Sequence, residues 1–424
     1  MVIRLTTYLD KFALLSPAQF GFQSGLSTYM ALMDMQTSIS DAMNSNKYSL
    51  GVFFDISKAF DTVNHALLLN KLEYYGIRGV AKQWFVDYLS NRNKFVSLRG
   101  MTSPSLEIAL GVSQESIFGP IVYLIYLNDL SRVSNKLKLN YVCDDTNAFL
   151  QNNSVDVLFD IMNSELCKIV EWFNISKLSL NADKTSYILF RTPRKKTIVQ
   201  NLYVNDTPLI QTQATKFLGV IIDQHLSWKD HVALISKKIS KNIGIIARIK
   251  YCLSTQNLLN LYYTLIFPYL SYCNIIWGCN YKSSLNHLYI LQKRIVRIIC
   301  GLHWCASTKL SFYELHLLTL ENINKYQILL FMFSFHNNLL PRSLHTNIAS
   351  CLKKNSDIHS HFTRSSSYYR SHYVRINIKL FSIFCTGPTL WNKLPDDLKN
   401  LNSLVAFKHL LKNALIIPPW SIEH

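Results

Sequence analysis

The stretch LGVFFDISKAFD, residues 50–61, decides the fold, because a run of apolar and aromatic residues ends abruptly in a carboxylate. Residues 50–54 are typical of a buried β-strand. Packing gives no reason for a charged residue directly after such a strand. We therefore expect Asp55 to end the strand and to serve chemistry. Asn64 then predicts the start of a helix that Gly76 ends.

A second acidic feature lies at Asp144 and Asp145, inside a segment, 139–150, that alternates apolar and polar residues. This alternation predicts a hairpin with the acidic pair at its turn. An isolated acidic pair in a turn is usually only solvated. If this hairpin lies beside the strand that ends at Asp55, however, three carboxylates converge. Their repulsion is large unless a cation neutralises it, and Mg²⁺ or Mn²⁺ prefers such oxygen ligands.

The pattern along the chain predicts an α+β unit followed by an α-helical one. Before residue 50 it indicates a loop and then a helix entered after Gly25. Further helices are expected at 79–90, 121–130 and 156–173, and further strands at 95–98, 106–108, 187–190 and 216–222. Residues 231 to about 340 have helical spacing. The last eighty residues predict only one element, around 403–411.

Composition excludes a mostly disordered chain and favours an anionic partner. Hydrophobic residues make up 49% of the 424 residues, and 44 Lys and Arg against 26 Asp and Glu give a net charge of +18. Nucleic acid and a membrane surface are both candidates, as is a basic protein without such a partner. The apolar stretch 258–277 contains Pro268 and two Asn residues, so we expect buried helices there and no membrane span.

The cysteines indicate a reducing, intracellular compartment, nuclear or cytoplasmic, for a protein that is not secreted. Nine Cys at scattered spacings do not form a disulfide framework, and the first residues lack the apolar core of a signal peptide. Cys300, His303 and Cys305 could be half of a zinc site, but no second Cys or His pair lies nearby.

Six ordered motifs resemble those of the reverse transcriptases of non-LTR (LINE, jockey-like) retrotransposons. The longest is FFDISKAFDTV at 53–63, where the family has a hydrophobic pair, Asp, Leu, Ser, Lys, Ala, Phe and Asp. The others are QFGF at 19–22, GVSQESIFGP at 111–120 with YLNDL at 126–130, VCDDT at 142–146, LSLNADKT at 178–185 and KFLGV at 216–220. GPTLWNKLPDDL at 387–398 resembles the downstream region of jockey-like elements.

The resemblance implies an RNA-directed DNA polymerase with a right-hand fold. Residues 1–222 would form truncated fingers and a palm with an antiparallel sheet plus helices, 223–345 a basic helical thumb, and 346–424 the C-terminal region of the element's polyprotein. The implied partners are an RNA template, a DNA primer and deoxynucleoside triphosphates, with no membrane. The oligomeric state stays open.

The resemblance also implies a role for each matching residue. Asp55, Asp144, Asp145 and the Ile56 carbonyl would hold Mg²⁺ or Mn²⁺, and two such ions can activate a 3′-hydroxyl and stabilise leaving pyrophosphate. Phe60, Gln114 and Lys184 would bind the nucleotide, although a core Phe or an ordinary exposed Lys would also explain two of them. Gly219 would let the primer backbone approach closely.

Basic residues at helical spacing supply the expected contacts to the nucleic-acid backbone. Lys237, Lys238 and Lys241 alternate with isoleucines at 235, 239 and 243, so the isoleucines should be buried and the lysines exposed. A solvated basic face without a ligand is the alternative.

Three departures from the family pattern bear on activity. Glu115 stands where the family has Gly and adds negative charge beside a polyanion. Ser113 replaces Pro, and Val142 with Cys143 replaces an aromatic-Ala pair. A family segment expected before residue 19 is also absent, which predicts a 5′-truncated, mutated copy. The alternatives to a working polymerase are a copy that only binds nucleic acid and a host-retained interaction scaffold.

Overall fold

The computed structural model describes residues 1–113, 116–196, 200–358, 365–371 and 373–416, without the side chains of residues 342, 343 and 347. The chain forms two compact units. The first contains residues 1–31 and 45–218, and the second contains residues 32–44 and 219–424. Within the described part of the chain, no helix combines the length and the apolar character needed to cross a bilayer.

A five-stranded sheet is the centre of the first unit, with strand order β13-β10-β1-β8-β7. All neighbours are antiparallel except β10 and β13. The strands are β1 Tyr48–Phe54, β7 Lys138–Val142, β8 Asp145–Asn152, β10 Ser186–Phe190 and β13 Ile210–Gln211. The predicted strand at 50–54 is therefore confirmed, and it is the middle strand because both of its faces are apolar.

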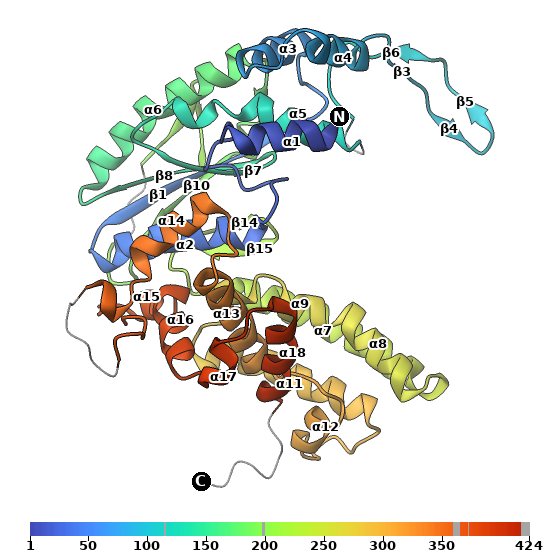
Figure 1. Ribbon diagram of the computed structural model, residues 1–424, viewed down its shortest axis with the longest axis vertical. Coiled ribbons are helices and arrows are strands. Elements are labelled where there is room, and N and C mark those ends of the chain that lie inside the picture. Colours follow the sequence, from blue (N-terminus) through green and yellow to red (C-terminus); the bar gives the residue numbers. More distant parts are fainter. Residues whose placement is uncertain (114–115, 197–199, 359–364, 372, 417–424) are drawn as a thin grey trace. The chain divides into compact units, whose positions relative to one another are not determined.

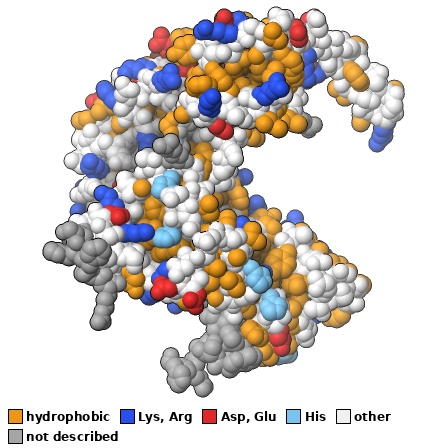
Figure 2. Space-filling view, viewed as in Figure 1, with side chains coloured by type: hydrophobic (Ala, Val, Ile, Leu, Met, Phe, Trp, Pro, Cys, Tyr) orange, Lys and Arg blue, Asp and Glu red, His pale blue; other side chains and the backbone are white. Residues whose placement is uncertain are grey.

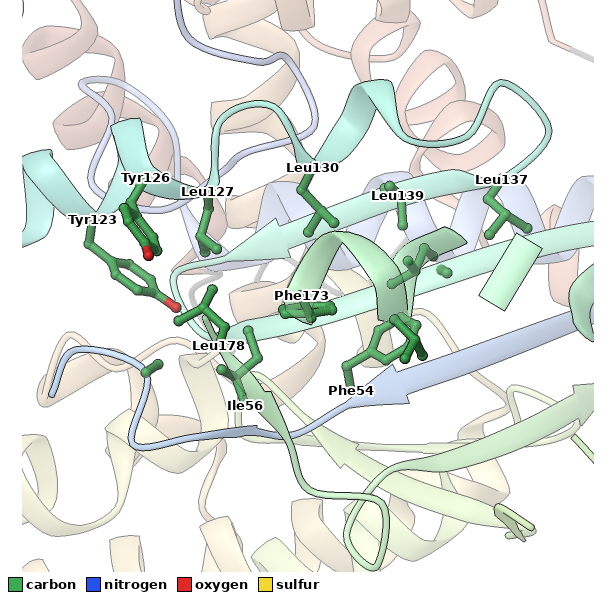
Figure 3. Close-up of a cluster of buried hydrophobic side chains, with 14 of the residues drawn as sticks. Phe54, Ile56, Tyr123, Tyr126, Leu127, Leu130, Leu137, Leu139, Phe173 and Leu178 are labelled. Atoms are coloured by element: carbon green, nitrogen blue, oxygen red, sulfur yellow. The ribbon is translucent and has the colours of Figure 1, made fainter. Parts of the chain in front are cut away.

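Helices cover one face of this sheet (Figure 1). They are α1 Val2–Lys11, α3 His65–Tyr74, α4 Val80–Leu89, α5 Phe118–Leu127 and α6 Val155–Ile175. Helix α5 is apolar all round, and its residues from Ile121 to Leu127 are buried. Figure 3 shows Tyr123 and Tyr126 of α5 among core side chains that include Ile56, Phe173 and Leu178.

Short strands complete the first unit. Two of them, β2 Ile56–Ser57 and β9 Ser179–Leu180, pair directly after β1 ends. Four more form a ribbon after α4, namely β3 Asn93–Lys94, β4 Ser97–Leu98, β5 Met101–Thr102 and β6 Leu106–Glu107. The remaining ones are β11 Tyr203–Val204, β12 Thr207–Pro208 and β14 Ala214–Phe217.

The second unit is almost entirely helical. It contains most of α2 Thr28–Asn44 and the strand β15 Val220–Asp223. Its other helices are α7 Lys229–Ile249, α8 Thr255–Leu265, α9 Phe267–Ser271, α10 Asn274–Trp277, α11 Lys282–Ile299, α12 Lys309–Glu314, α13 Leu320–His336, α14 Arg342–Cys351, α15 Asn377–Leu380, α16 Ile383–Asn392, α17 Asp396–Lys399 and α18 Leu404–Leu415. Its core includes Phe333 of α13 stacked on Phe407 of α18, with ring centroids 4.1 Å apart.

Three parts of the predicted pattern were wrong. The single strand expected at 216–222 is interrupted by a turn at 218–219, which separates β14 from β15. The first residues form helix α1, whose Leu5 and Leu9 are buried, and they are not a loop. The described part of the last eighty residues contains most of α14 and all of α15, α16, α17 and α18, and not a single element. Helix α16 includes Pro388 and packs on α13, so burial of Phe384 and Trp391 stabilises a helix that its sequence does not favour.

Candidate active site

The pairing of β1 with β8 brings two of the three aspartates to opposite positions. Phe54 pairs with Thr146, so one further step along the same register sets Asp55 opposite Asp145. Directly opposed residues of an antiparallel pair have Cβ atoms about 5 Å apart, and like charges there destabilise the sheet. Asp144 belongs to the adjoining turn, so the sheet brings Asp55 to the hairpin that carries Asp144 and Asp145.

The acidic pair lies at the predicted hairpin, with Asp144 in the turn and Asp145 as the first residue of β8. Val142 of β7 pairs with Asp145 of β8, which leaves Cys143 and Asp144 as a two-residue turn. Cys143 has φ +60°, a conformation that is unfavourable for a residue with a Cβ. The Gln19 side chain supports the turn, because its Oε1 accepts a hydrogen bond from the Cys143 amide at 3.4 Å and from the Gly21 amide at 2.8 Å.

The pKa of Asp145 reflects the neighbouring carboxylates. Although Asp145 is an exposed residue, partial burial of its carboxyl and the charges of Asp144 and Asp55 raise its pKa to about 6, against a smaller opposite effect of Lys216. Burial and the charges of Asp144 and Asp145 raise the pKa of the Cys143 thiol to about 12. A divalent cation would offset this repulsion.

A clamp of hydrogen bonds fixes the backbone at Asp55. The Asn181 amide donates to the Asp55 carbonyl at 2.9 Å, and the Asp55 amide donates to the Thr185 hydroxyl at 3.3 Å. The Thr185 hydroxyl in turn donates to the Asn181 carbonyl at 2.8 Å. Along an antiparallel strand, every second residue directs its amide and carbonyl toward the partner strand. Because Asp55 directs its carbonyl toward Asn181, the carbonyl of the next residue, Ile56, is turned away from β9.

Phe60 lies on an aromatic floor. Its half-buried ring stacks on Tyr123 of α5, with ring centroids 4.3 Å apart and an interplanar angle of 26°. Tyr123 is fully buried, and its pKa is raised well above the usual value, mainly by burial and then by the charge of Asp144. The floor is therefore close to the acidic turn.

The other expected nucleotide-binding residues are less defined. Gln114, and the departure at Glu115, lie outside the described residues. Lys184 is exposed on the turn between Asn181 and Thr185.

The primer- and template-binding candidates all belong to the second unit. Gly219 has φ +79°, and a Cβ there would come within 3.3 Å of the Tyr272 ring. Lys237, Lys238 and Lys241 are exposed on α7, while the isoleucines at 235, 239 and 243 are buried, so the predicted amphipathic pattern is confirmed. Lys238 also lies over the Tyr269 ring, with its Nζ 5.4 Å from the centroid.

The donor set at the acidic turn fits a divalent cation in its chemistry. Three carboxylates and a backbone carbonyl are hard oxygen donors of the kind that Mg²⁺ selects, and burial, followed by the charges of Asp144 and Asp55, raises the pKa of Asp145. Throughout the described ranges, however, no three His, Cys, Asp or Glu side chains are already gathered as metal ligands. The same finding applies to Cys300, His303 and Cys305, where His303 Nδ1 lies 2.9 Å from Cys305 Sγ.

Some residues of the site were not predicted from the sequence. Thr185, Asn181 and Gln19 belong to recognised motifs, so the signal was present, but only the fold shows that they hold the backbone of Asp55 and of the turn. Tyr123 and Lys216 gave no separate signal. Tyr123 looked like one more apolar position of α5, and Lys216 like the start of a strand.

Comparisons with known proteins agree with this geometry. A family model described as reverse transcriptase (RNA-dependent DNA polymerase) matches residues 1–222. The chain is 26% identical over 341 residues to the probable RNA-directed DNA polymerase from transposon X-element of Drosophila melanogaster, which covers 77% of this chain and 36% of that protein. It is 25% identical over 385 residues to the RNA-directed DNA polymerase from mobile element jockey of the same species, and this alignment covers 87% of this chain and 41% of that protein.

The chain thus spans less than half the length of these two relatives. Among solved structures, apo telomerase from Candida tropicalis gives a TM-score of 0.39 at 11% identity, covering 71% of this chain and 49% of that one. The family match extends over more than half of the chain and contains all three aspartates. The chain belongs to the reverse transcriptase family, in the group of non-LTR retrotransposon RNA-directed DNA polymerases that includes jockey.

Proposed function

We propose that this chain extends a DNA primer on an RNA template by nucleotidyl transfer at Asp55, Asp144 and Asp145. The observation that carries the proposal is the register of β1 and β8, which opposes Asp55 to Asp145 beside the turn that carries Asp144. Asp55 and the acidic pair come from distant parts of the sequence, and burial together with the charges of Asp144 and Asp55 raises the pKa of Asp145 to about 6.

In the reaction, the primer 3′-oxygen forms a bond to the α-phosphorus of a deoxynucleoside triphosphate, and the bond to the pyrophosphate oxygen breaks. Mg²⁺ or Mn²⁺, when bound, would lower the pKa of the 3′-hydroxyl and neutralise the pyrophosphate. Asp55, Asp144, Asp145 and the Ile56 carbonyl would hold the ions. The Thr185 clamp keeps the Asp55 backbone fixed, which limits the reorganisation needed during the reaction.

The remaining proposed roles follow from the family motifs and, for Phe60, also from its position. Phe60, supported by Tyr123, offers a flat apolar surface to the sugar of the incoming nucleotide, where a 2′-hydroxyl would be crowded. Gln114 would contact that nucleotide, and Lys184 could donate a proton to the pyrophosphate.

In the second unit, Gly219 and the lysines at 237, 238 and 241 would contact the primer–template backbone. Contacts to phosphates suit an enzyme that must accept every template base.

Primer extension on poly(rA)/oligo(dT) with Mg²⁺ or Mn²⁺ tests the proposal. We expect the wild-type chain to extend the primer and the Asp144→Asn/Asp145→Asn variant to lose activity at least 100-fold. Asp206→Asn is the matched control, because Asp206 also lies in a two-residue hairpin turn of the first unit. If wild type and the double variant extend equally, the proposal is wrong.

The Glu115→Gly variant tests the main departure from the family pattern. Removing a negative charge beside a triphosphate should raise activity. Unchanged or lower activity would contradict that reasoning without touching the role of the three aspartates.

A further inference from the structure

A β-ribbon, here called the arm and comprising residues 91–110, extends from the end of α4 away from the rest of the first unit (Figure 1). Near its base, Asn93 pairs with Glu107 and Lys94 with Leu106. Near its tip, Ser97 pairs with Thr102 and Leu98 with Met101. Between these pairs, the Ser103 amide donates to the Val96 carbonyl at 2.9 Å, and the Ser103 hydroxyl accepts from the Val96 amide at 2.9 Å.

The arm is exposed along its whole length although many of its side chains are apolar. Every residue from 93 through 107 is exposed. Phe95, Val96, Leu98, Met101 and Leu106 are between 61% and 78% exposed. Isolated two-stranded ribbons are marginally stable, and contiguous exposed apolar side chains mark binding surfaces. The apolar side chains of the arm therefore do not pack in the core of the first unit and are available to a binding partner.

The tip combines a tight turn with apolar and basic side chains. Arg99 has φ +49° and Gly100 has φ +81°, as a type I′ turn requires, so Leu98 and Met101 form a directly opposed pair at the very end of the ribbon. Their exposed fractions are 70% and 78%. Figure 2 shows hydrophobic side chains along this ribbon and basic ones at its end.

The charge of the arm favours a polyanion over another protein. It carries Arg92, Lys94 and Arg99 against the single acid Glu107, a net charge of 3 − 1 = +2. A second copy of this basic chain, with its formal charge of +18, would be repelled at long range. Nucleic acid matches both the basic side chains and the apolar tip, because apolar side chains can insert between stacked bases.

The base of the arm is fixed beside the proposed nucleotide site. Leu110 forms a β-bridge with Asn64, the Gly111 amide donates to the Val63 carbonyl at 2.8 Å, and the Val112 amide donates to the Phe60 carbonyl at 2.8 Å. The template base being copied pairs with the incoming nucleotide. Template that has not yet been copied therefore approaches a site that lies beside the base of the arm.

We propose that the arm opens base-paired RNA ahead of synthesis, with Leu98 and Met101 stacking on the terminal base pair of the template duplex and Lys94 and Arg99 contacting its phosphates. The end of the duplex is the target because the major groove of A-form RNA is too narrow to admit side chains. A six-residue limb, Asn93 to Leu98, reaches up to about 20 Å from its base. This inference rests on the proposed polymerase function.

The test compares primer extension on two templates with the full chain. One template is single-stranded ahead of the primer, and the other has an RNA strand annealed one nucleotide downstream. The Leu98→Ser/Met101→Ser variant should extend the open template within twofold of wild type and slow at least tenfold on the blocked one. Ile3→Ser/Val80→Ser is the matched control, because these side chains of the same unit are 80% and 90% exposed outside the arm. If the tip variant extends both templates at the same rates as wild type, the inference is wrong.

A binding measurement separates failure of this inference from failure of the proposed function. Fluorescence anisotropy measures affinity for the blocked RNA fork without any catalysis. We expect the tip variant to bind the fork at least fivefold more weakly than the control variant, even if the wild-type chain extends no primer. Unchanged fork affinity would overturn the inference. The inference would also be wrong if the tip variant changed only the self-association measured by sedimentation equilibrium, because the arm would then join two copies of the chain.

Discussion

The Thr185 clamp provides the most direct test of how the fold holds the backbone of Asp55 in the proposed site. Thr185 is fully buried, and its hydroxyl both accepts from the Asp55 amide at 3.3 Å and donates to the Asn181 carbonyl at 2.8 Å. Thr185→Val keeps the shape of the side chain and removes both bonds. The Asn181 carbonyl retains the Thr185 amide at 2.9 Å, so the Asp55 amide is the group that loses its partner.

The expected cost follows from these bonds. An unsatisfied, partly buried amide costs about 1–2 kcal/mol, and the lost hydroxyl donation costs about 1 kcal/mol more. Thr185→Val should therefore lower the free energy of unfolding by about 2–3 kcal/mol. Thr185→Ser keeps the hydroxyl and loses one buried methyl group, so its loss should be about 1 kcal/mol.

Urea denaturation measures the stability change, and primer extension across a Mg²⁺ titration measures the effect on the site. Because Asp55 would no longer be held in place, we expect Thr185→Val to require more Mg²⁺ for half-maximal rate, with Thr185→Ser close to wild type. If Thr185→Val only reduced the amount of folded protein, the rate would fall at every Mg²⁺ concentration, and the Mg²⁺ concentration for half-maximal rate would not change.

Thr146→Val is the matched control in the neighbouring strand. Thr146 is 1% exposed, and its hydroxyl has no hydrogen-bond partner among the described residues. Replacing it should leave stability unchanged or raise it, because an unpaired buried hydroxyl is removed. The reasoning is refuted if Thr185→Val is as stable as wild type and has the same Mg²⁺ dependence, or if Thr146→Val is the more damaging of the two.

Three further predictions concern charge and helix propensity. The pKa of Asp145 is raised to about 6, so ionisation of its carboxyl destabilises the fold as pH rises from about 4 through 6. Asp144→Asn should therefore raise the free energy of unfolding at pH 7 in metal-free buffer by up to about 1 kcal/mol and have little effect at pH 4. An equal effect at both pH values would contradict this. Lys71 Nζ lies 2.6 Å from Asp129 Oδ1, and burial lowers the pKa of Lys71. Asp129→Asn should therefore destabilise the chain at pH 7, and the loss of stability should shrink toward pH 10 as Lys71 loses its proton. A loss that does not depend on pH in thermal melts would rule out this cause. Gly244 lies exposed within α7, and a Cβ there would meet nothing within 4 Å, so Gly244→Ala should raise the free energy of unfolding by about 1 kcal/mol in urea denaturation, whereas a loss would reveal a contact at this position.

Much of the first unit could be predicted because its signals are local. The apolar run before Asp55, the alternation around Asp144 and Asp145, and the cap at Asn64 each act over a few residues, and the Asn64 side chain does accept a hydrogen bond from the Leu67 amide at 3.1 Å. The helix at 383–392 could not be predicted, because its apolar side chains and Pro388 show no helical preference until α13 covers them. Helix α1 was missed for a similar reason, since only Leu5 and Leu9 of its ten residues are buried.

The sequence by itself determined the family, the three aspartates and the basic face of α7, because each depends on residue identity at fixed spacing. Only the tertiary structure decided which residues hold those aspartates. The β1–β8 register opposes Asp55 to Asp145, and Thr185, 130 positions after Asp55, becomes a backbone partner of that residue. The physical reason is that strand register and hydrogen bonds between distant segments depend on how the whole core packs, which no local pattern encodes.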